Sequence, residues 1–513
     1  MRANRRRRTA GVVVAVSVAL IVAACGDDDD DDAEATAAAT QPTAAPTTQG
    51  ESSSTTEPAS TEAPEIPTDH VCPHVPNVVL VQNPDGPEPD LPGNVEPLEP
   101  AQLTELLGYE DFPGIEVEDE LREMFAASAI TPYRVTDDGD SLEIAAQIEA
   151  DNADLIEPDD DDSNVVGLDD SGPAGLVAAP LLLLTLTGHW TLAPGDDPAA
   201  ITASPPTPPD VAFASEGTVA VVDTGYTTGN GEIPTTEWLD ARVQGVDQSF
   251  DAELSNIEHA GHGKFVASII TQEAPNVEVR VARLGAIDPS VVPDDLENNF
   301  TTDELQLYIA IKRLLQLDLP YSALNLSLGA YACEELGDPA VANSGLAIRE
   351  AVEFWFSSLG GEPPPVLAAV GNHDPNDSSP LPPFLPAAYD TDPNGPIYAV
   401  ESVNAAGNTS GFSNPGPLDP GGASVAVGGL GERLIGIGVD NDWVYWSGTS
   451  FATALMTAEA VLNGGVPPSS YPVPDSVEAE PPPTSTTPPT TIGSNTVTTT
   501  TRPPTSVTTT TLG

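Results

Sequence analysis

The sequence predicts a three-layer α/β fold between residues 215 and 465, with a mainly parallel central sheet and helices on both faces. Short apolar runs rich in β-branched residues predict strands that are buried on both faces. Longer segments with helical periodicity alternate with these runs, and that alternation favours a parallel sheet. A region of roughly 250 residues can bury a sizeable core without disulfides.

The elements of this region follow one another as strands and helices. The expected strands are residues 217–223, 277–283, 321–328, 366–370 and 397–403. The expected helices are residues 262–271, 304–317, 344–358 and 451–462. In open α/β sheets the carboxyl ends of the strands carry the site, so polar residues that follow the strands are candidates for chemistry.

Three candidates occur in the order acid, base, nucleophile. Asp223 ends the first strand, and His262 opens a helix between two glycines, which let its ring approach a neighbour closely. Ser450 lies at or near the N-terminus of the last helix, where unbonded N–H groups and the helix dipole favour a developing oxyanion. Singly, each has an ordinary interpretation as a turn Asp, a structural His or a helix cap, and His259 is a rival base.

A fourth candidate is Asn372, which follows the strand at 366–370. Its amide could donate a hydrogen bond to an oxyanion, a role worth about two to three powers of ten in rate. An ordinary Asn in a turn after a strand is the competing interpretation.

Together these residues lie in four boxes that resemble those of the subtilases, the subtilisin-like serine peptidases. The boxes are Asp-Thr-Gly at 223–225, His-Gly-x-x-Val-Ala at 262–267, Ala-x-Gly-Asn at 369–372 and Gly-Thr-Ser-x-Ala at 448–452. Asn-Leu-Ser-Leu-Gly at 325–329 is similar to the family's substrate-binding strand, and Phe-Ser-Asn-Pro-Gly at 412–416 to its Phe-Ser-Asn turn. The resemblance covers about half of the chain, roughly residues 215–465.

The resemblance implies a subtilisin-like fold and a serine endopeptidase that acts on protein or peptide substrates through an acyl-enzyme. Ser450 would attack the scissile carbonyl, His262 would carry the proton, and Asp223 would orient the imidazole. Asn372 and a backbone N–H near Ser450 would hold the oxyanion. The backbone of Ser327, Leu328 and Gly329 would pair with an extended substrate.

The sequence departs from the family pattern in the His box. Lys264, Phe265 and Ser268 stand where the family usually has Thr, His and Gly. An inward Lys264 would lower the pKa of His262, whereas a solvent-facing Lys264 would be ordinary. The region also ends soon after its last helix. These departures keep open a catalytically inactive surface lipoprotein of the subtilisin fold that acts as a binding module. A sedolisin-like acid peptidase is another alternative, against which His262 and Asn372 argue.

Residues 1–24 have the pattern of a lipoprotein-type signal peptide, with an arginine cluster and then an apolar run too short for a standard spanning helix. Val-Ala-Ala-Cys at 22–25 resembles a bacterial lipobox, which implies lipidation of Cys25 and a membrane-anchored protein on the extracellular side of the cell membrane. An ordinary secretory signal is the alternative. Residues 25–70 and 466–513 are expected to be a disordered acidic, Thr/Pro-rich tether and a disordered Thr/Pro-rich tail.

The composition excludes some partners. The chain has 16 Lys and Arg against 79 Asp and Glu, for a formal net charge of −63, which argues against nucleic acid as a partner. Members of the family often bind calcium, so the resemblance allows it, but no calcium loop stands out and we expect no metal ligands or other cofactor.

Residues 71–165 are expected to be a small α+β domain, followed by a linker at 166–214. We expect a strand at 78–81, helices at 118–127 and 141–150 with Asp140 as a cap, a strand at 153–158 and a buried strand within 175–187. A helix followed by a strand that ends in Glu-Pro resembles the closing part of subtilase propeptides, and an unrelated accessory domain is the alternative. Cys72 and Cys333 could form a disulfide between this domain and the next region, or remain two thiols.

Overall fold

The computed structural model describes the following residues: 72–84, 89–109, 116–136, 139–152, 176–185, 199–201, 205–226, 228, 236–246, 261–285, 301–333, 344–360, 363–373, 381–390, 395–418 and 424–471. Cys25, the tether, the strand expected at 153–158 and the chain beyond 471 lie outside these residues. Within them, no helix is both long and apolar enough to cross a membrane.

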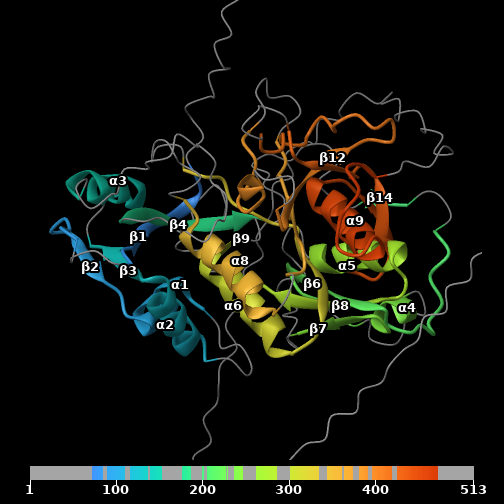
Figure 1. The fold of residues 1–513 in the computed structure, drawn as a ribbon, viewed down its shortest axis with the longest axis horizontal. Helices are drawn as coiled ribbons and strands as arrows, with labels where there is room; N and C mark the ends of the chain where they lie inside the picture. The colour runs from blue at the N-terminus through green and yellow to red at the C-terminus, as the bar shows by residue number, and fades with distance from the viewer. Residues whose placement is uncertain are drawn as a thin grey trace, which may run out of the picture. The chain divides into compact units, whose positions relative to one another are not determined.

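The central sheet has seven strands among the described residues, in the order β13-β12-β11-β10-β6-β8-β7, and all neighbouring pairs are parallel (Figure 1). The strands are β6 Gly217–Asp223, β7 Val243–Gly245, β8 Val277–Arg283, β10 Tyr321–Leu326, β11 Val366–Ala369, β12 Ile397–Val403 and β13 Val427–Leu430. The predicted bounds of β6, β8 and β12 are confirmed. β10 ends two residues and β11 one residue before the predicted end. Their remaining residues leave the sheet and line the candidate site.

Helices cover both faces of this sheet, which confirms the predicted layers. On β6, Val219 and Val221 pack with the helices α5 and α9, whereas Ala220 and Val222 pack with the helices α6 and α8 on the other face. The helices of this region are α4 Glu237–Asp240, α5 His262–Glu273, α6 Glu304–Gln316, α8 Leu346–Ser358, the short 3-10 helix η5 Ala387–Tyr389, and α9 Thr449–Leu462. Alternate side chains of each strand thus join opposite layers.

A small antiparallel sheet packs against α5. It consists of β14 Leu434–Ile437, β15 Trp443–Trp446 and β5 Ala199–Ala200. After α9 the chain returns to the central sheet, where Gly428 of β13 donates to Ser469 O and accepts from Tyr471 N. Residues 466–471, which we expected to begin a disordered tail, therefore contact the sheet edge.

The N-terminal domain is an α+β unit, as predicted. Its sheet has the order β2-β3-β1-β4-β9 and is antiparallel. Its strands are β1 His74–Gln82, β2 Val95–Pro97, β3 Ile130–Val135 and β4 Val177–Thr185, with β9 Thr301–Asp303 from the catalytic region, and its helices are α1 Pro100–Leu107, α2 Val117–Ser128 and α3 Ser141–Asp151. Asp140 caps α3, because its carboxylate accepts from Leu142 N at 2.8 Å. The buried strand expected within 175–187 is β4, so a segment that we assigned to a linker supplies a central strand.

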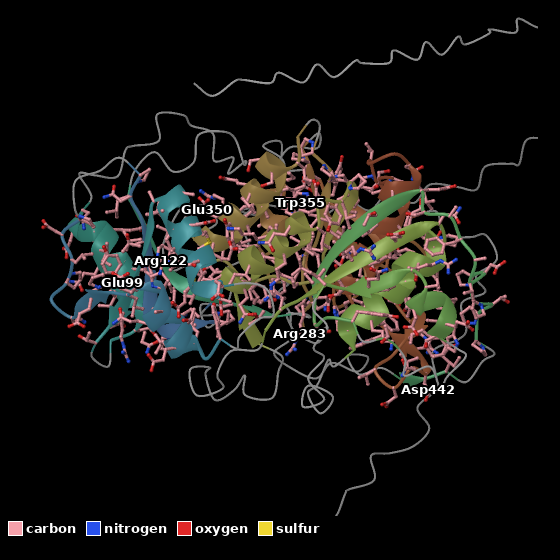
Figure 2. All side chains as sticks on the ribbon, turned by 90° about the horizontal axis from the view of Figure 1, so that it is seen from below. Glu99, Arg122, Arg283, Glu350, Trp355 and Asp442 are labelled. Atoms are coloured by element: carbon pink, nitrogen blue, oxygen red, sulfur yellow. A yellow bond between two sulfur atoms is a disulfide. The ribbon has the colours of Figure 1, made fainter. Side chains whose placement is uncertain are left out.

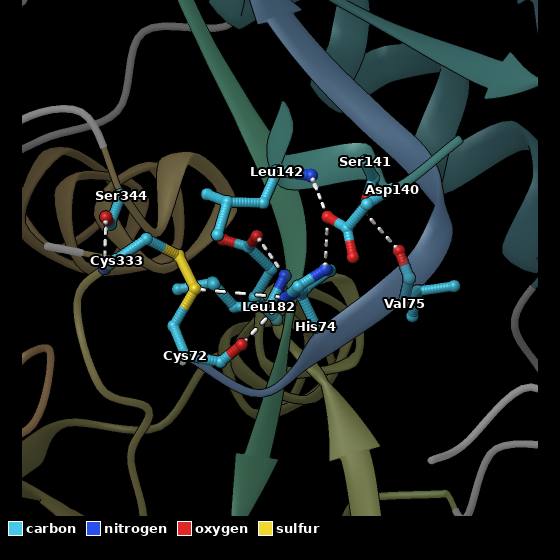
Figure 3. The surroundings of a disulfide bond; sticks show 10 residues. Cys72, His74, Val75, Asp140, Ser141, Leu142, Leu182, Cys333 and Ser344 are labelled. Atoms are coloured by element: carbon cyan, nitrogen blue, oxygen red, sulfur yellow. Dashed lines mark hydrogen bonds and ion pairs between the residues drawn. A yellow bond between two sulfur atoms is a disulfide. The ribbon is translucent and has the colours of Figure 1, made fainter. Parts of the chain in front are cut away.

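A seam joins the N-terminal domain to the catalytic region. The disulfide between Cys72 and Cys333 forms one part of it, which resolves the choice between pairing and two thiols (Figure 3). The pairing of β4 with β9 forms a second part. On α8, Glu350 accepts a hydrogen bond from Gln82 of β1 at 3.3 Å and lies on the side of the helix nearer the N-terminal domain (Figure 2).

Two buried acids complete the seam. Asp303 caps α6 by accepting from the N–H groups of Leu305 and Gln306, and it also accepts from the Tyr109 hydroxyl of the N-terminal domain at 2.5 Å. The adjacent Glu304 accepts from Leu182 N of β4 with one oxygen and from two N–H groups at the start of α8 with the other. Both acids are 0% exposed, and their donors offset only part of the lost hydration.

Candidate active site

Asp223 and His262 form a closed, buried pair. Both carboxylate oxygens of Asp223 lie within 2.8–2.9 Å of Nδ1 of His262, and both side chains are 0% exposed. Asp223 lies at the end of β6, as predicted, and also accepts from Thr224 N at 2.7 Å. A carboxylate that accepts from Nδ1–H leaves Nε2 as the acceptor, which is the tautomer required of a general base.

Glycine at 263 makes this approach possible. A Cβ built on Gly263 would lie 2.7 Å from the carbonyl oxygen of Gly225 and 3.0 Å from Cβ of Asp223. The N–H of Gly263 instead donates to Oγ1 of Thr224 at 2.9 Å. The second residue of the His box and the Asp-Thr-Gly box therefore meet directly, which confirms the close approach expected from the glycines.

Aromatic rings surround the imidazole. His262 lies edge-to-face with Trp446, at 5.6 Å between centroids, and its ring centroid is 5.1 Å from that of Phe451. Phe265 packs on both of these rings. The imidazole is thus shielded from water on these sides, which strengthens its bond to Asp223. No motif in the sequence singles out Trp446 and Phe451 as neighbours of the imidazole, although both flank the Gly-Thr-Ser box.

Ser450 lies in the first turn of α9, which begins at Thr449. Its hydroxyl donates to the carbonyl oxygen of Ser327 at 3.0 Å. Nε2 of His262 is buried and forms no hydrogen bond with any residue that the structure describes. The hydroxyl has to leave Ser327 to reach the imidazole. The predicted base and nucleophile therefore lie close together without a hydrogen bond to Nε2 of His262.

Asn372 follows β11 and lies against the N-terminus of α9. Its Oδ1 accepts from Thr449 N at 3.0 Å, which fixes the amide plane and directs the Nδ2 donors away from Thr449. Its backbone oxygen accepts from the Tyr331 hydroxyl at 3.3 Å. Gly371 before it has φ of 91°, a conformation that favours glycine. This placement fits the predicted oxyanion donor.

The Phe-Ser-Asn turn at 412–416 supports Asn372. Ser413 forms a β-bridge with Asn372, and Asn414 donates to Val370 O at 3.1 Å while its N–H donates to Gly371 O at 3.0 Å. His373 bonds Oδ1 of Asn414 at 3.1 Å. The turn noted in the sequence therefore holds the segment that carries Asn372, the predicted oxyanion donor.

The predicted substrate-binding residues Ser327, Leu328 and Gly329 continue β10 next to Ser450. Oγ of Ser327 lies 2.7 Å from Ser450 O and 3.0 Å from Oδ1 of Asn325, and its one proton is shared between these two acceptors. Asn325 donates in turn to Oγ1 of Thr457 on α9 at 3.0 Å. This buried polar chain fixes the start of α9 against β10. Asn325 lies in the motif that we quoted, but no signal in the sequence points to Thr457.

Lys264 is buried and does not face solvent, so that alternative is wrong. Its ammonium bonds Oδ1 of Asn441 and lies 5.5 Å from the centroid of Tyr226. Burial lowers the pKa of Lys264 to about 8, and the charge of Asp240 opposes that shift. Ser268, the third departure, donates to Phe265 O and accepts from Ile437 N of β14. These departures therefore have packing partners in the small sheet.

Among the described residues, no group of three or more His, Cys, Asp or Glu side chains could hold a metal ion. Calcium therefore stays an inference from family resemblance alone. The Asp pair at 294–295 lies outside the described residues.

Comparisons with known proteins identify the family of this region. Residues 214–464 match the model of the subtilase family, Peptidase_S8. The solved structure of MycP1 from Mycobacterium smegmatis is 20% identical, with 52% of this chain and 77% of that chain covered and a TM-score of 0.34. A cold adapted subtilisin-like serine proteinase is 21% identical, with 54% and 86% covered and a TM-score of 0.31. The patellamide maturation protease PatA is 22% identical, with 49% and 78% covered and a TM-score of 0.31.

A search of the curated proteins finds no match. The assignment therefore depends on the family model over residues 214–464 and on the agreement of its motifs with the buried site. Residues 214–464 belong to the subtilase family, and this region is a subtilisin-like serine endopeptidase domain.

Proposed function

We propose that this chain hydrolyses peptide bonds through Asp223, His262 and Ser450. The observation that carries the proposal is the closed pair of Asp223 and His262, buried beside the N-terminus of α9 where Ser450 lies. In the first step, Oγ of Ser450 forms a bond to the scissile carbonyl carbon while its proton passes to Nε2 of His262. The carbonyl oxygen becomes an oxyanion near Nδ2 of Asn372 and the first N–H groups of α9.

The later steps return the enzyme to its starting state. The C–N bond breaks, the imidazolium of His262 gives its proton to the leaving amine, and an acyl ester remains on Ser450. Water then attacks the ester, with His262 again as base, and releases the acid. Asp223 stays ionised and stabilises the imidazolium in each half.

The test is labelling by a fluorophosphonate, which forms a covalent bond only with an activated serine. We expect the exported full-length chain to be labelled and the Ser450→Ala variant not to be. Ser447→Ala is the matched control, because Ser447 is three residues away and its hydroxyl accepts from Arg433 N outside the triad. Equal labelling of the wild type and Ser450→Ala would contradict the proposal.

Nε2 of His262 forms no hydrogen bond with Ser450 or any other described residue. This observation favours one second candidate, an inactive binding module of this fold. In that case the Ser450 hydroxyl remains bonded to Ser327 O. A folded protein that reacts with no fluorophosphonate and cleaves no protein would support this candidate.

We further propose that Cys25 carries the lipid that anchors the protein on the outer side of the cell membrane. The supporting observation is the sequence Val-Ala-Ala-Cys at the end of the apolar run of residues 11–24. Growth with an alkyne fatty acid should label the wild type but not Cys25→Ser, and the variant should leave the membrane fraction. An unlabelled wild type that is found in the medium would instead indicate an ordinary secretory signal.

The N-terminal domain is proposed to act as a propeptide-like partner of the catalytic domain. Its support is the seam, in which β4 pairs with β9 and a disulfide joins Cys72 to Cys333. A cut between β4 and β6 would leave both parts covalently joined. The mature protein should then run as one band without reductant and as two bands with it, whereas a single band under both conditions would indicate an uncut accessory domain.

A further inference from the structure

The two segments that flank the candidate site continue two neighbouring parallel strands. β10 pairs with β11 as far as Leu326 opposite Ala368. Beyond that point, β10 continues as Ser327–Gly329 beside the nucleophile, and β11 continues to Asn372 beside the N-terminus of α9. Any side chain that enters between these extensions lies next to the reacting groups.

Phe384 and Leu385 cross the space between the two extensions. The N–H of Phe384 donates to Val370 O at 3.0 Å, which ties it to the extension of β11. Leu385 exchanges two hydrogen bonds with Ala330, at 2.8 and 3.2 Å, which ties it to the extension of β10. The segment therefore closes one end of the space between the two extensions. We call this space the crevice.

The Phe384 ring fills that crevice. A Cβ built on Gly329 would lie 2.7 Å from Cβ and 2.8 Å from Cδ2 of Phe384. A Cβ built on Gly371 would lie 2.9 Å from Cδ1 and Cε1 of the same ring. Glycine on both sides therefore leaves the room that the ring takes, and the ring is 1% exposed.

Tyr331 holds the ring in place. The two rings are edge-to-face with centroids 4.4 Å apart, and the Tyr331 hydroxyl donates to Asn372 O at 3.3 Å. Leu381 joins the same buried cluster. Phe384 would have to break these contacts to swing aside, so its ring is a fixed part of the crevice.

A residue that supplies the scissile carbonyl can place its side chain in the crevice. Its carbonyl carbon has to lie at Oγ of Ser450 with its oxygen near Asn372, and its backbone runs along Ser327–Gly329. Successive side chains of an extended peptide point to opposite faces, and we take the side chain of this residue to lie on the crevice side.

We propose that Phe384 is a specificity-determining residue that restricts this substrate position to Gly, Ala or Ser. The inference rests on the proposed function and names the substrate class of that site. A large side chain would have to displace the Phe384 ring from its contacts with Gly329 and Gly371. A small side chain needs no such change, because it ends before it reaches the ring.

The test measures kcat/KM of the full-length chain on peptides that differ only in the residue before the scissile bond. We expect Ala to exceed Phe by on the order of 100-fold, since a pocket of fixed size rejects a larger side chain by about this factor. Phe384→Ala should raise the rate for the Phe and Leu peptides and shift the Phe-to-Ala ratio at least about 10-fold. An equal or higher rate for the Phe peptide in the wild type would overturn the inference.

A milder pair of variants covers the case in which Phe384→Ala does not fold. Phe384→Leu replaces the ring with a smaller side chain. It should shift the Phe-to-Ala ratio of kcat/KM in the same direction by less. Phe354→Leu is the matched control, since Phe354 packs on Tyr308 elsewhere, and it should leave the ratio unchanged. An equal shift in both Leu variants would also overturn the inference.

Fluorophosphonate labelling of the same preparations separates the two possible failures. A labelled Ser450 together with a preference for Phe or Leu overturns the specificity inference and leaves the proposed function intact. An unlabelled protein that cleaves none of the peptides overturns the proposed function, and the specificity inference with it.

Discussion

The active site and the seam both bury carboxylates beside a helix N-terminus, but these carboxylates have different partners. Asp223 faces an imidazole that can become charged. Asp303 and Glu304 face backbone N–H groups and a tyrosine hydroxyl. A carboxylate beside an imidazole can stabilise the imidazolium that forms during a reaction, whereas backbone N–H and tyrosine O–H donors offer no such change in charge. The proposed catalytic role therefore belongs to Asp223, and the two seam acids serve docking and stability.

The two seam acids have raised pKa values. Burial raises the pKa of Asp303 to about 6 and that of Glu304 to about 7, against the opposing effect of their N–H and O–H donors. Nearby Tyr109 has its pKa raised well above the usual value, chiefly by burial. Ionising Asp303 and Glu304 in the folded protein therefore costs free energy. This cost makes the stability of the folded protein depend on pH.

The largest expected effect is on the rate, at Asp223. Asp223→Asn should lower kcat/KM on the order of 10⁴-fold, because an amide opposite Nδ1 favours the wrong tautomer of His262. The variant should remain folded, since Asn can still bond the ring. Steady-state kinetics and a thermal melt check both statements. A loss of activity matched by a loss of folding would instead class Asp223 with the seam acids.

The next effect concerns Asn372. Asn372→Ala should lower kcat about 10²- to 10³-fold with little change in KM, because the amide would donate to the oxyanion only in the transition state. Kinetics on one peptide ester measures the two constants separately. A rise in KM at constant kcat would show that Asn372 binds the ground state instead.

At the seam, the disulfide should have the larger effect. The double variant Cys72→Ser with Cys333→Ser should lose about 2–4 kcal/mol of unfolding free energy, because the crosslink closes a loop of 261 residues in the unfolded chain. Urea melts measure this change. If activity on small peptides fell in parallel in the still-folded variant, the seam and the site would not be independent.

The smallest effect is the pH dependence of the seam. Because the pKa of Glu304 is raised in the folded state, the stability linked to it is fully present below about pH 4 and is lost as pH rises through about 7. Glu304→Gln should reduce the change in unfolding free energy between pH 5 and pH 8 by on the order of 2 kcal/mol. Glu96→Gln, an exposed matched control on β2, should retain the wild-type slope. An unchanged slope in Glu304→Gln would contradict this assignment.

The sequence predicted the elements that local patterns specify. Strands β6, β8 and β12 have the predicted bounds, and α5 and α9 begin within two residues of the predicted starts. The triad candidates and Asn372 were predictable because each lies in a short motif at the end of a strand or the start of a helix. The structure brings these four residues together at the carboxyl ends of the central strands.

Features that depend on long-range pairing were not predictable. β4 was expected to be a buried strand, but its pairing with β1 and β9 involves residues about 100 positions away on either side. Other features depend on tertiary contacts that leave no periodic pattern in the chain. These are the bond from Asn325 to Thr457, the rings around His262, and the placement of Phe384 between Gly329 and Gly371.

The most direct test of the account is to identify the residue that carries the acyl group. The full-length chain would be mixed with a peptide ester that has Ala before the scissile bond, quenched in acid within the first turnover, digested and mapped by mass spectrometry. We predict an acyl group on Ser450 in the wild type, and its accumulation to a much lower level in Asp223→Asn. An acyl group on another residue, or none while the ester is hydrolysed, would contradict the assignment of Ser450 as the nucleophile.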